Sequence, residues 1–414
     1  MGVYDRSFTG NKEVYLAQKL MFAAQKLMFW GKWMQFTTPD GRVVDPNRLT
    51  PAVSNAPLVV HRELEKKQGD KIQVPMIRNL VNIPKYGDTQ LSGQEEETKM
   101  NHCDVYLDMV RHANKVQDGS MMKQTTKDID IAKRAKPLLE RHYAEVSNFL
   151  QVPYAFYKGF SSNILGSNRF SSVVSTKSHP HIFVAGSGKV TYGTADYPGT
   201  ANYEAAVATA IDGVGPTHVF DTELLTGLRN EDQIRMIPYL YTEEGMQYRI
   251  IVAHHYQLAS LIKDPDFRSV MNAALGGAEK LAKKNPYLVG CKYLWEDWAI
   301  FDGGNGVFPV STSSSLPVYG PTTVSDLTSF QDYSSYDKFA AIVIGDNAMA
   351  KATGSGMEFI SEERDYREIV GIGYRILEGW ARPDYWNRDD GTLGATIKND
   401  TSAIVITSAA KPTY

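Results

Sequence analysis

The sequence predicts an α+β fold from which a long two-stranded ribbon projects, and three observations carry this prediction. Two segments with alternating apolar residues, 72–76 and 103–109, flank a polar stretch and are typical of paired strands. A long helical pattern follows from Met121 to Leu150. The C-terminal part contains further strand patterns, at 340–344, 369–377 and 403–407.

The composition is that of a globular protein. Of the 414 residues, 43% are hydrophobic and 22% charged, enough for a real core and for roughly two or three domains. A net charge of −3 argues against a dedicated nucleic-acid-binding protein, which is usually basic. With only Cys103 and Cys291, no disulfide framework is expected, and folding in a reducing cytoplasm is the default. Lysines interrupt the most apolar stretch, Val14 to Phe36, so we expect neither a transmembrane helix nor a signal peptide.

The first element is predicted to be an amphipathic helix in an N-terminal arm. A direct seven-residue repeat places Ala17–Phe22 and Ala24–Phe29 one after the other. On a helix, one apolar stripe would contain Leu16, Leu20, Ala23, Leu27, Trp30 and Met34. Two readings remain open: a helix of the core, or a helix that packs on its own subunit and on a neighbour.

The ribbon comes next and carries no catalytic group. Its polar tip, from Asn82 to Asn101, includes the acidic run Glu95-Glu96-Glu97. An isolated two-stranded ribbon is only marginally stable in water, so its apolar face needs a surface to lie on. We expect that face to contain Ile72, Val74 and Met76 opposite Val105, Leu107 and Met109. Because nothing local supplies the surface, a neighbouring copy of the chain is the simplest supplier.

The long helix over 121–150 contains Pro137, which should kink it or start a new helix there. A strand is expected at 181–185, and a second compositional unit begins near Thr222. That unit contains a strong strand over 246–253 and a helix that Asp264-Pro265 would begin. The passage 301–338, rich in Ser, Thr, Gly and Pro, is predicted to be a loop or an extended excursion.

No catalytic or metal-binding constellation emerges from the residues. Gly186-Ser187-Gly188-Lys189 fails the phosphate-loop pattern at both ends. The histidines lack further ligands at metal-binding spacing, and the cysteines are single. We therefore expect no catalytic residue, no metal and no cofactor.

Several short motifs follow one another in a characteristic order. They are Gly69-Asp70-Lys71-Ile72, Leu91-Ser92-Gly93-Gln94-Glu95-Glu96, Met121-Met122, Tyr248-Arg249-Ile250-Ile251-Val252, Asp264-Pro265-Asp266-Phe267, Ile344-Gly345-Asp346-Asn347-Ala348 and Glu363-Arg364-Asp365-Tyr366. This order resembles the major capsid proteins of tailed bacteriophages, in particular the branch of podoviruses with N4-like capsids. The resemblance covers roughly Pro57 to Ser408.

The resemblance implies the tailed-phage capsid fold, which is shared with the herpesvirus capsid floor. The expected units are an N-terminal arm (1–56), an extended loop that is the ribbon (57–118), a peripheral domain with a long spine helix (119–221), an axial domain (222–345) and return strands (346–414).

The function implied is that of a major capsid protein that assembles into an icosahedral shell around double-stranded DNA. Its partners would be identical subunits in pentamers and hexamers, the packaged DNA through non-specific contacts, and portal, scaffolding or decoration proteins. We expect no membrane partner, and assembly in the host cytoplasm into a virion.

The residues expected at contacts between subunits lie in the arm and the ribbon. They are Leu20, Leu27, Phe29, Trp30, Val74, Met76, Arg78, Lys85, Glu95, Glu96, Glu97, Val105 and Leu107. Two alternatives stay open: a cellular compartment shell of the same fold that encloses an enzyme, and a soluble enzyme with an unrecognised site among His254, His255 and Glu296.

Overall fold

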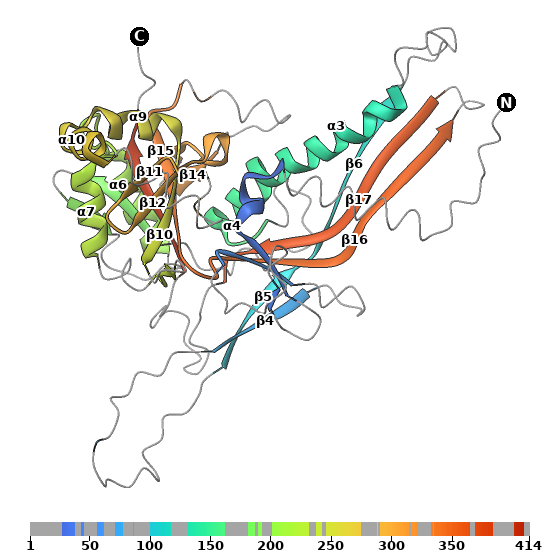
Figure 1. The fold of residues 1–414 in the computed structure, drawn as a ribbon, viewed down its shortest axis with the longest axis horizontal. Helices are drawn as coiled ribbons and strands as arrows, with labels where there is room; N and C mark the ends of the chain where they lie inside the picture. The colour runs from blue at the N-terminus through green and yellow to red at the C-terminus, as the bar shows by residue number, and fades with distance from the viewer. Residues whose placement is uncertain are drawn as a thin grey trace.

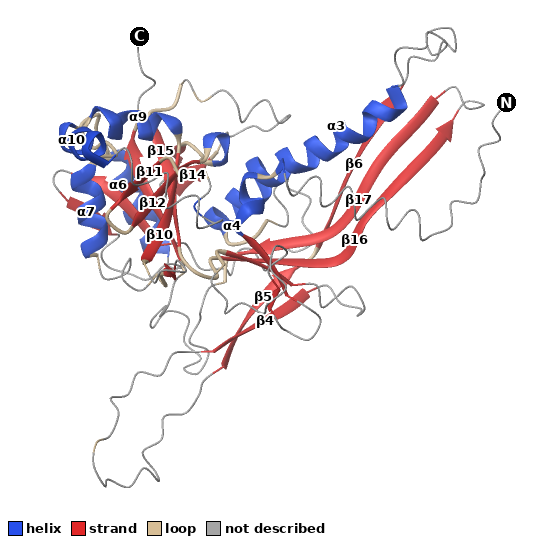
Figure 2. Ribbon diagram, viewed as in Figure 1, coloured by secondary structure: helices blue, strands red, loops and turns tan. Residues whose placement is uncertain are grey.

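The structure is a computed structural model of the whole chain. It describes residues 27–37, 43–44, 56–61, 71–77, 86, 100–116, 131–161, 181–186, 189–192, 201–231, 237–241, 246–274, 288, 290–313, 316–320, 333, 335–364, 369–383 and 401–409. Helices and strands both contribute, and they divide between an elongated unit and a compact unit (Figures 1 and 2).

The elongated unit is a six-stranded sheet with one long helix along it. The strands follow the order β2-β1-β3-β16-β17-β6. Their bounds are β1 (Met34–Thr37), β2 (Val43–Val44), β3 (Leu58–His61), β6 (Asp108–Val116), β16 (Met349–Arg364) and β17 (Ile369–Ala381). Helix α3 (Ile131–Val146) runs beside β6, β17 and β16, which extend far from the rest of the molecule (Figure 1).

The compact unit contains an eight-stranded sheet, with the main order β11-β12-β10-β15-β18-β7-β8 and β9 paired to β10. Its strands are β7 (His181–Gly186), β8 (Lys189–Tyr192), β9 (Leu240–Tyr241), β10 (Gln247–Ala253), β11 (Tyr293–Trp295), β12 (Trp298–Asp302), β15 (Lys338–Ile344) and β18 (Ser402–Ser408). Its helices are α6 (Ala201–Asp212), α7 (Thr222–Asn230), α9 (His255–Lys263) and α10 (Pro265–Ala274).

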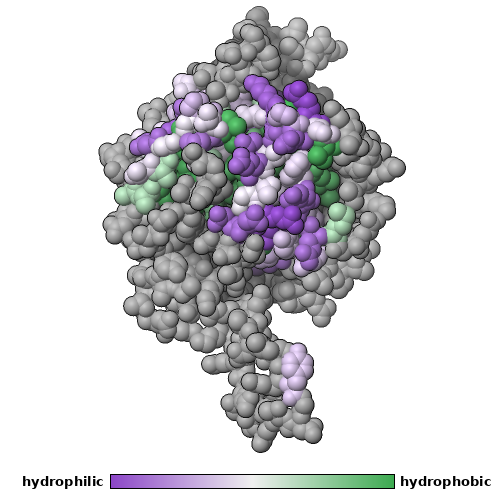
Figure 3. Space-filling view, turned by 90° about the vertical axis from the view of Figure 1, so that its left-hand side faces the viewer, coloured by the Kyte–Doolittle hydropathy of each residue, from purple (hydrophilic) through white to green (hydrophobic). Residues whose placement is uncertain are grey.

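Alternation along the central strands sends side chains to both faces of this sheet, and both faces are covered. Ile251 and Val343 pack on one face with apolar residues of α7, α9 and α10. Ile250 and Ile342 pack on the other with α6 and with α4 (Val152–Lys158). On the outer side that Figure 3 shows, most of the coloured surface is hydrophilic and hydrophobic residues form smaller patches.

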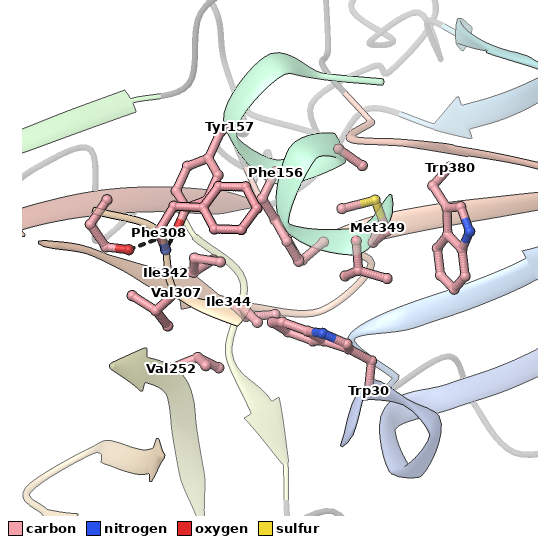
Figure 4. Close-up of a cluster of buried hydrophobic side chains, with 14 of the residues drawn as sticks. Trp30, Phe156, Tyr157, Val252, Val307, Phe308, Ile342, Ile344, Met349 and Trp380 are labelled. Atoms are coloured by element: carbon pink, nitrogen blue, oxygen red, sulfur yellow. Dashed lines mark hydrogen bonds between the residues drawn. The ribbon is translucent and has the colours of Figure 1, made fainter. Parts of the chain in front are cut away.

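One hydrophobic core continues from the compact unit into the elongated unit. Figure 4 shows Trp30 and Phe156 between Ile342 of the compact unit and Trp380 of the elongated one, all of them buried. The hydroxyl of Tyr157 donates a hydrogen bond to the Ala340 carbonyl (2.7 Å) and accepts one from the Phe308 amide (3.2 Å). The two sheets are therefore joined by packing and not only by the chain.

Two hairpins lie outside these sheets. The ribbon pairs β4 (Lys71–Ile77) with β5 (Met100–Tyr106) in antiparallel fashion, which confirms the predicted pairing. The second hairpin, β13 (Val310–Ser313) with β14 (Leu316–Tyr319), lies in the passage predicted to be extended or loop-like. A short 3-10 helix, η5 (Gly304–Gly306), precedes it.

The predicted arm helix is wrong for its second half. From Phe29 to Trp33 the chain forms a 3-10 turn, η1, and Met34 begins strand β1. Trp30 and Trp33 are both fully buried, Trp30 against Phe156 and Trp33 against Phe301, so tertiary packing decides this conformation. Residues 14–26 of the predicted helix lie outside the described residues.

The predicted interruption of the long helix is displaced. Helix α3 continues through Pro137, whose side chain is exposed, so water can satisfy the carbonyl that loses its donor. The irregularity comes later, where a π-helical segment, η3 (Ser147–Gln151), joins α3 to α4. The part of the prediction before Ile131 lies outside the described residues.

In the second half of the chain, the strands expected at 181–185, 246–253, 340–344, 369–377 and 403–407 are all present. Helix α10 begins at Pro265 as predicted, but α9 and the long strand β16 were not predicted. Strands β7 and β8 belong to the compact unit, whereas the sequence had grouped them with the long helix.

Candidate functional site

The ribbon lies on the six-stranded sheet of its own chain. Its root is formed by Ile72, Val105 and Leu107, whose side chains are buried. They pack against Phe160 and three alanines of β16 and β17, which are Ala350, Ala352 and Ala381. Nothing near the ribbon in the sequence supplies this surface, as expected. The inference that a neighbouring copy supplies it is wrong for the root, because alanines more than 200 positions later in the same chain do so.

Small residues allow this close approach. A Cβ atom added to Gly379 would collide with the backbone oxygen of Tyr106, and one added to Gly354 would lie 2.8 Å from Leu107 Cδ1. Both glycines lie on the face that holds the three alanines. Glycine is required where one backbone lies this close to another. These small residues, Ala350, Ala352, Gly354, Gly379 and Ala381, form the surface on which the ribbon root packs, and we call this surface the seat.

Two further contacts fix the ribbon root. The rings of Tyr106 and Phe160 meet edge to face, with their centroids 5.6 Å apart. Across the ribbon, Lys71 Nζ lies 2.8 Å from Asp104 Oδ2 at a partly exposed position. An ion pair exposed in this way contributes less to stability than the buried apolar contacts.

The opposite face of the sheet is fixed to α3 by a buried ion pair. Lys351 Nζ lies 2.8 Å from Glu378 Oε2, and both side chains are almost fully buried. The Tyr143 hydroxyl on α3 donates to the same carboxylate oxygen (2.7 Å) and accepts from Lys351 Nζ (3.2 Å). Burial, together with Glu378, raises the pKa of Tyr143 well above its ordinary value, so this hydroxyl stays a donor.

A histidine pair links α3 to β6 farther along. The rings of His142 and His112 stack with centroids 3.8 Å apart, and His142 Nδ1 lies 3.2 Å from the Tyr374 hydroxyl. Burial, and then the neighbouring His112, lower the pKa of His142, while Glu145 opposes them. The helix is thus held at two points along the sheet.

The arm enters between the two units. The backbone amide of Phe29 donates to Asn148 Oδ1 (2.9 Å), and Trp30 Nε1 donates to the Asn148 carbonyl (3.3 Å). Asn148 belongs to the π-helical segment, so that irregular turn holds the arm. Lys32 Nζ lies 4.1 Å from the centre of the Phe301 ring, and burial lowers its pKa to about 8.

These positions correct part of the predicted set of contact residues. Trp30, Val105 and Leu107 are buried inside the subunit, because the two units and the small-residue seat already enclose them. Phe29 and Val74 are partly buried, whereas Leu27 is 58% exposed. The remaining positions lie outside the described side chains; they are Leu20, Met76, Arg78, Lys85, Glu95, Glu96 and Glu97.

The register of the ribbon also differs from the prediction. Ile72 faces Val105 as expected, but Val74 faces Cys103 and Met76 faces Asn101. Leu107 follows the end of β5, and Met109 already belongs to β6 of the large sheet. The alternation after Cys103 therefore spans two strands, β5 of the ribbon and β6 of the six-stranded sheet.

The residues of the enzyme alternative have structural partners. His254 caps the start of α9, where its Nδ1 accepts a hydrogen bond from the backbone amide of Tyr256. Its ring stacks on that of Phe339. Glu296 pairs with Arg229 at 2.9 Å. In the described part of the chain, no group of three or more His, Cys, Asp or Glu side chains is placed to hold a metal ion. Among the described helices, none is long and apolar enough to cross a membrane.

Sequence reasoning missed the residues that receive the ribbon. Their signal is a run of small residues at every second position, Ala350-x-Ala352-x-Gly354 on β16 and Gly379-x-Ala381 on β17. On a strand, that spacing places all of them on one face and predicts a close neighbour there. No comparable pattern marks Lys351 and Glu378, whose pairing depends on the register of β16 and β17.

Comparisons with known proteins agree on one type of molecule. The sequence profile of a family described as phage capsid protein matches residues 18–412. No curated protein sequence matches the chain.

Three solved structures that share this fold are all phage capsids. The capsid of Ralstonia phage GP4 has a TM-score of 0.59 at 17% identity and covers 87% of this chain and 90% of its own. The capsid asymmetric unit of cyanophage Pam1 gives 0.53 at 13% identity, with the same coverage of 87% and 90%. The capsid of Helicobacter pylori bacteriophage KHP30 gives 0.50 at 13%, with 86% and 88% covered.

Proposed function

Because the chain belongs to the phage capsid protein family, we propose that its copies close into rings of five and six that form the shell of a tailed-phage head. Membership in this family makes the chain a major capsid protein, a structural protein of the virion. The observation that carries the proposal is the family match over 18–412, which includes both units and the ribbon. The N4-like branch remains a prediction.

The geometry supports such an assembly. The elongated unit and the ribbon extend well beyond the compact unit, so a single copy presents long surfaces to its neighbours (Figure 1). In the proposed shell, the compact unit gathers around the ring axes as the axial domain, and the elongated unit forms the periphery. Head-to-tail contacts of this kind generate closed rings when the rotation between copies closes.

The proposed partners are identical subunits in pentamers and hexamers, and double-stranded DNA inside the shell through contacts that do not depend on its sequence. Portal, scaffolding or decoration proteins complete the proposed set. We assign no catalytic step to the chain, since a shell held together by packing needs none. Its place is the virion, with assembly in the host cytoplasm.

Negative-stain electron microscopy of the purified full-length protein tests this proposal. We expect closed polyhedral particles of uniform diameter above a threshold concentration. A variant with a weakened subunit contact should shift that threshold without changing the circular dichroism spectrum. A compact monomer that persists at high concentration would overturn the proposed shell.

A further inference from the structure

Two histidines from different elements stack at the edge of the six-stranded sheet. His142 belongs to α3, and His112 belongs to β6, the last strand in the order of that sheet. Their ring centroids are 3.8 Å apart, and the ring planes differ by only 15°. We call His112 and His142 the histidine stack. It joins the long helix to the edge strand.

The strand register places the stack over a third aromatic ring. On β6, Val110, His112 and Asn114 share the face that meets α3, and His112 lies directly across from Tyr374 of β17. The Tyr374 ring centroid lies 6.4 Å from that of His112 and 6.3 Å from that of His142. His142 Nδ1 lies 3.2 Å from the Tyr374 hydroxyl. One helix and two strands therefore meet at these three rings.

Protons from solvent can reach the histidine stack. His112 is exposed and His142 is half-buried, whereas Tyr374 is buried. The stacked arrangement is favourable while at least one ring is neutral. Two imidazolium rings at this separation would repel each other, because each carries a full positive charge.

The helix supplies one acidic neighbour for the stack. Glu145, one turn after His142 on α3, favours the charged form of that imidazole. Its Oε1 already accepts a hydrogen bond from Arg141 Nε at 2.7 Å. The effect of Glu145 on the pKa of His142 is smaller than the effects of burial and of His112, both of which lower it.

The strands beneath the stack supply no unpaired carboxylate within the described residues. On this face of β16 and β17, the described charged side chains are Lys351 and Glu378, which pair with each other at 2.8 Å. On β6, Asp108 shares the face of His112 but lies four residues away, about 13 Å along a strand. Tyr374 keeps its proton, because burial, and then Glu378, raise its pKa.

A second histidine pair provides a comparison within the same chain. His254 and His255 lie at the start of α9 in the compact unit, with ring centroids 3.9 Å apart. His254 is fully buried, and burial lowers its pKa to about 3. That pair therefore cannot carry two charges in mildly acidic solution, so α9 should keep its contacts there. The histidine stack differs because His112 is exposed.

We propose that the histidine stack is a pH-sensitive switch, which holds α3 on β6 and β17 with at most one proton on the two rings and releases this part of the helix when both rings are protonated. Repulsion between the two cations separates the helix from the edge strand, while the buried pair of Lys351 and Glu378 keeps its own contact with Tyr143. The proposal concerns a single copy, so it goes beyond the proposed shell and does not depend on it.

The direction of the pH dependence follows from His142. In the unfolded chain this imidazole takes up its proton near its ordinary pKa of 6.5, and in the folded chain its pKa is lower. The unfolded state therefore binds more protons between these two values. The contribution of the stack to stability is fully present above about pH 6.5 and is lost as the pH falls below it.

Hydrogen exchange of the full-length protein at pH 7.5 and pH 5.0 tests the switch. After correction for the intrinsic pH dependence of exchange, the α3 amides of the wild type should exchange about fivefold faster at pH 5.0, the effect of two unit charges about 4 Å apart in water. The amides of α9 should show no such increase. In His112→Gln only one ring can be charged, so most of the increase in α3 should disappear. His255→Gln is the matched control and should keep the wild-type response of α3.

Each result of this experiment supports or overturns the switch. A wild-type response in α3 no larger than that in α9 would overturn it. A full response in His112→Gln would assign the pH dependence to other groups and would also overturn it. Loss of the α3 response in His255→Gln would show that pH acts through the compact unit, and the proposal would fail.

Nuclear magnetic resonance of protein labelled with carbon-13 histidine gives a second measurement. The His142 signal is identified by its loss in His142→Gln. In the wild type it should titrate below pH 6.5, and in His112→Gln its midpoint should rise because the neighbouring positive charge is gone. In the wild type alone, the two rings should titrate in separate steps, since the first proton opposes the second. Equal midpoints of His142 in the two proteins, or one common midpoint for both rings in the wild type, would overturn the switch.

Discussion

The eight-stranded and six-stranded sheets differ in how far one copy of the chain covers them. In β15, every residue from Phe339 to Ile344 is buried, because helices lie on both faces. In β17, the residues from Ile376 to Ala381 are buried except for Leu377, which is partly buried, and Arg375 is exposed. The sheet of the compact unit is thus covered on both faces within one copy, whereas the sheet of the elongated unit leaves part of one face exposed.

This difference separates two kinds of stability. Changes in the compact unit, or where α3 and the ribbon root meet the sheet, should alter the unfolding of the single chain. Changes at exposed apolar residues of the six-stranded sheet, such as Met109 and Ile360, should alter assembly and leave unfolding almost unchanged. The predictions below test that division, beginning with the largest expected effect on the free energy of unfolding.

The buried ion pair should give the largest effect. Replacing Lys351 with Met leaves the Glu378 carboxylate buried without its cation, and we expect the free energy of unfolding to fall by about 3–5 kcal/mol. Urea denaturation followed by circular dichroism measures this change. The double variant Lys351→Met, Glu378→Leu removes both charges and should recover much of the loss. A single variant as stable as wild type would show that the pair does not hold α3 to the sheet.

The joint between the two sheets should respond to pH. Asp346 lies between β15 and β16, and its Oδ1 is buried with no hydrogen-bond partner among the described residues. Burial raises the pKa of Asp346 to about 7, although hydrogen bonds from the backbone amides of Ala56 and Asn347 oppose this shift. In the unfolded chain this carboxyl ionises near its ordinary value of 3.8. Between these values the folded state holds the extra proton, so its contribution to stability is present below about pH 4 and is lost as the pH rises to about 7.

The expected loss across that window is at most about 4 kcal/mol, since each unit of pKa difference corresponds to about 1.4 kcal/mol. Thermal unfolding at pH 4 and pH 8 measures it. Asp346→Asn cannot ionise, so the variant should lose this part of the pH dependence and should exceed wild type in stability at pH 8. An unchanged pH profile in the variant would assign the dependence to other groups.

The sequence predicted the elements whose pattern is local. Strands such as β10 and β18 are continuous apolar runs, and β4 with β5 shows a period of two, so each could be found without knowing its neighbours. The start of α10 was visible because Asp264-Pro265 is a helix-start signal by itself. The family resemblance rested on the order of such local motifs.

What could not be predicted depends on contacts between distant residues. The repeat around Trp30 has helical spacing, yet packing between the two units makes it a 3-10 turn. The partner of the ribbon was assigned to another copy because the seat around Ala350 and Gly379 lies far away in the sequence. Strand β16 was missed because its small and polar residues lack an apolar alternation.

Leu107 and Met109 provide a direct comparison between the covered and open parts of one face. Leu107 is buried in the ribbon root, so Leu107→Ala should lower the free energy of unfolding by about 3 kcal/mol. Met109 is exposed, so Met109→Ala should change it by less than about 0.5 kcal/mol. Chemical denaturation and particle formation should be measured for both variants. We expect Leu107→Ala to lower the free energy of unfolding and Met109→Ala to reduce particle formation. Equal effects on unfolding would remove the distinction between the two parts.

Among the changes at buried positions, the one at Gly379 should give the smallest loss. In Gly379→Ala, the new methyl group meets the Tyr106 backbone, so the ribbon root must shift, and we expect a cost of about 1–3 kcal/mol. Gly215→Ala is the matched control, because nothing lies within 4 Å of its added Cβ. Hydrogen exchange of the β4 and β5 amides should increase in the first variant only, since the strain falls on the root and not on the compact unit. If exchange increases across both sheets instead, the ribbon root and the sheet beneath it unfold as one unit, and the seat stabilises the whole elongated unit and not the ribbon alone.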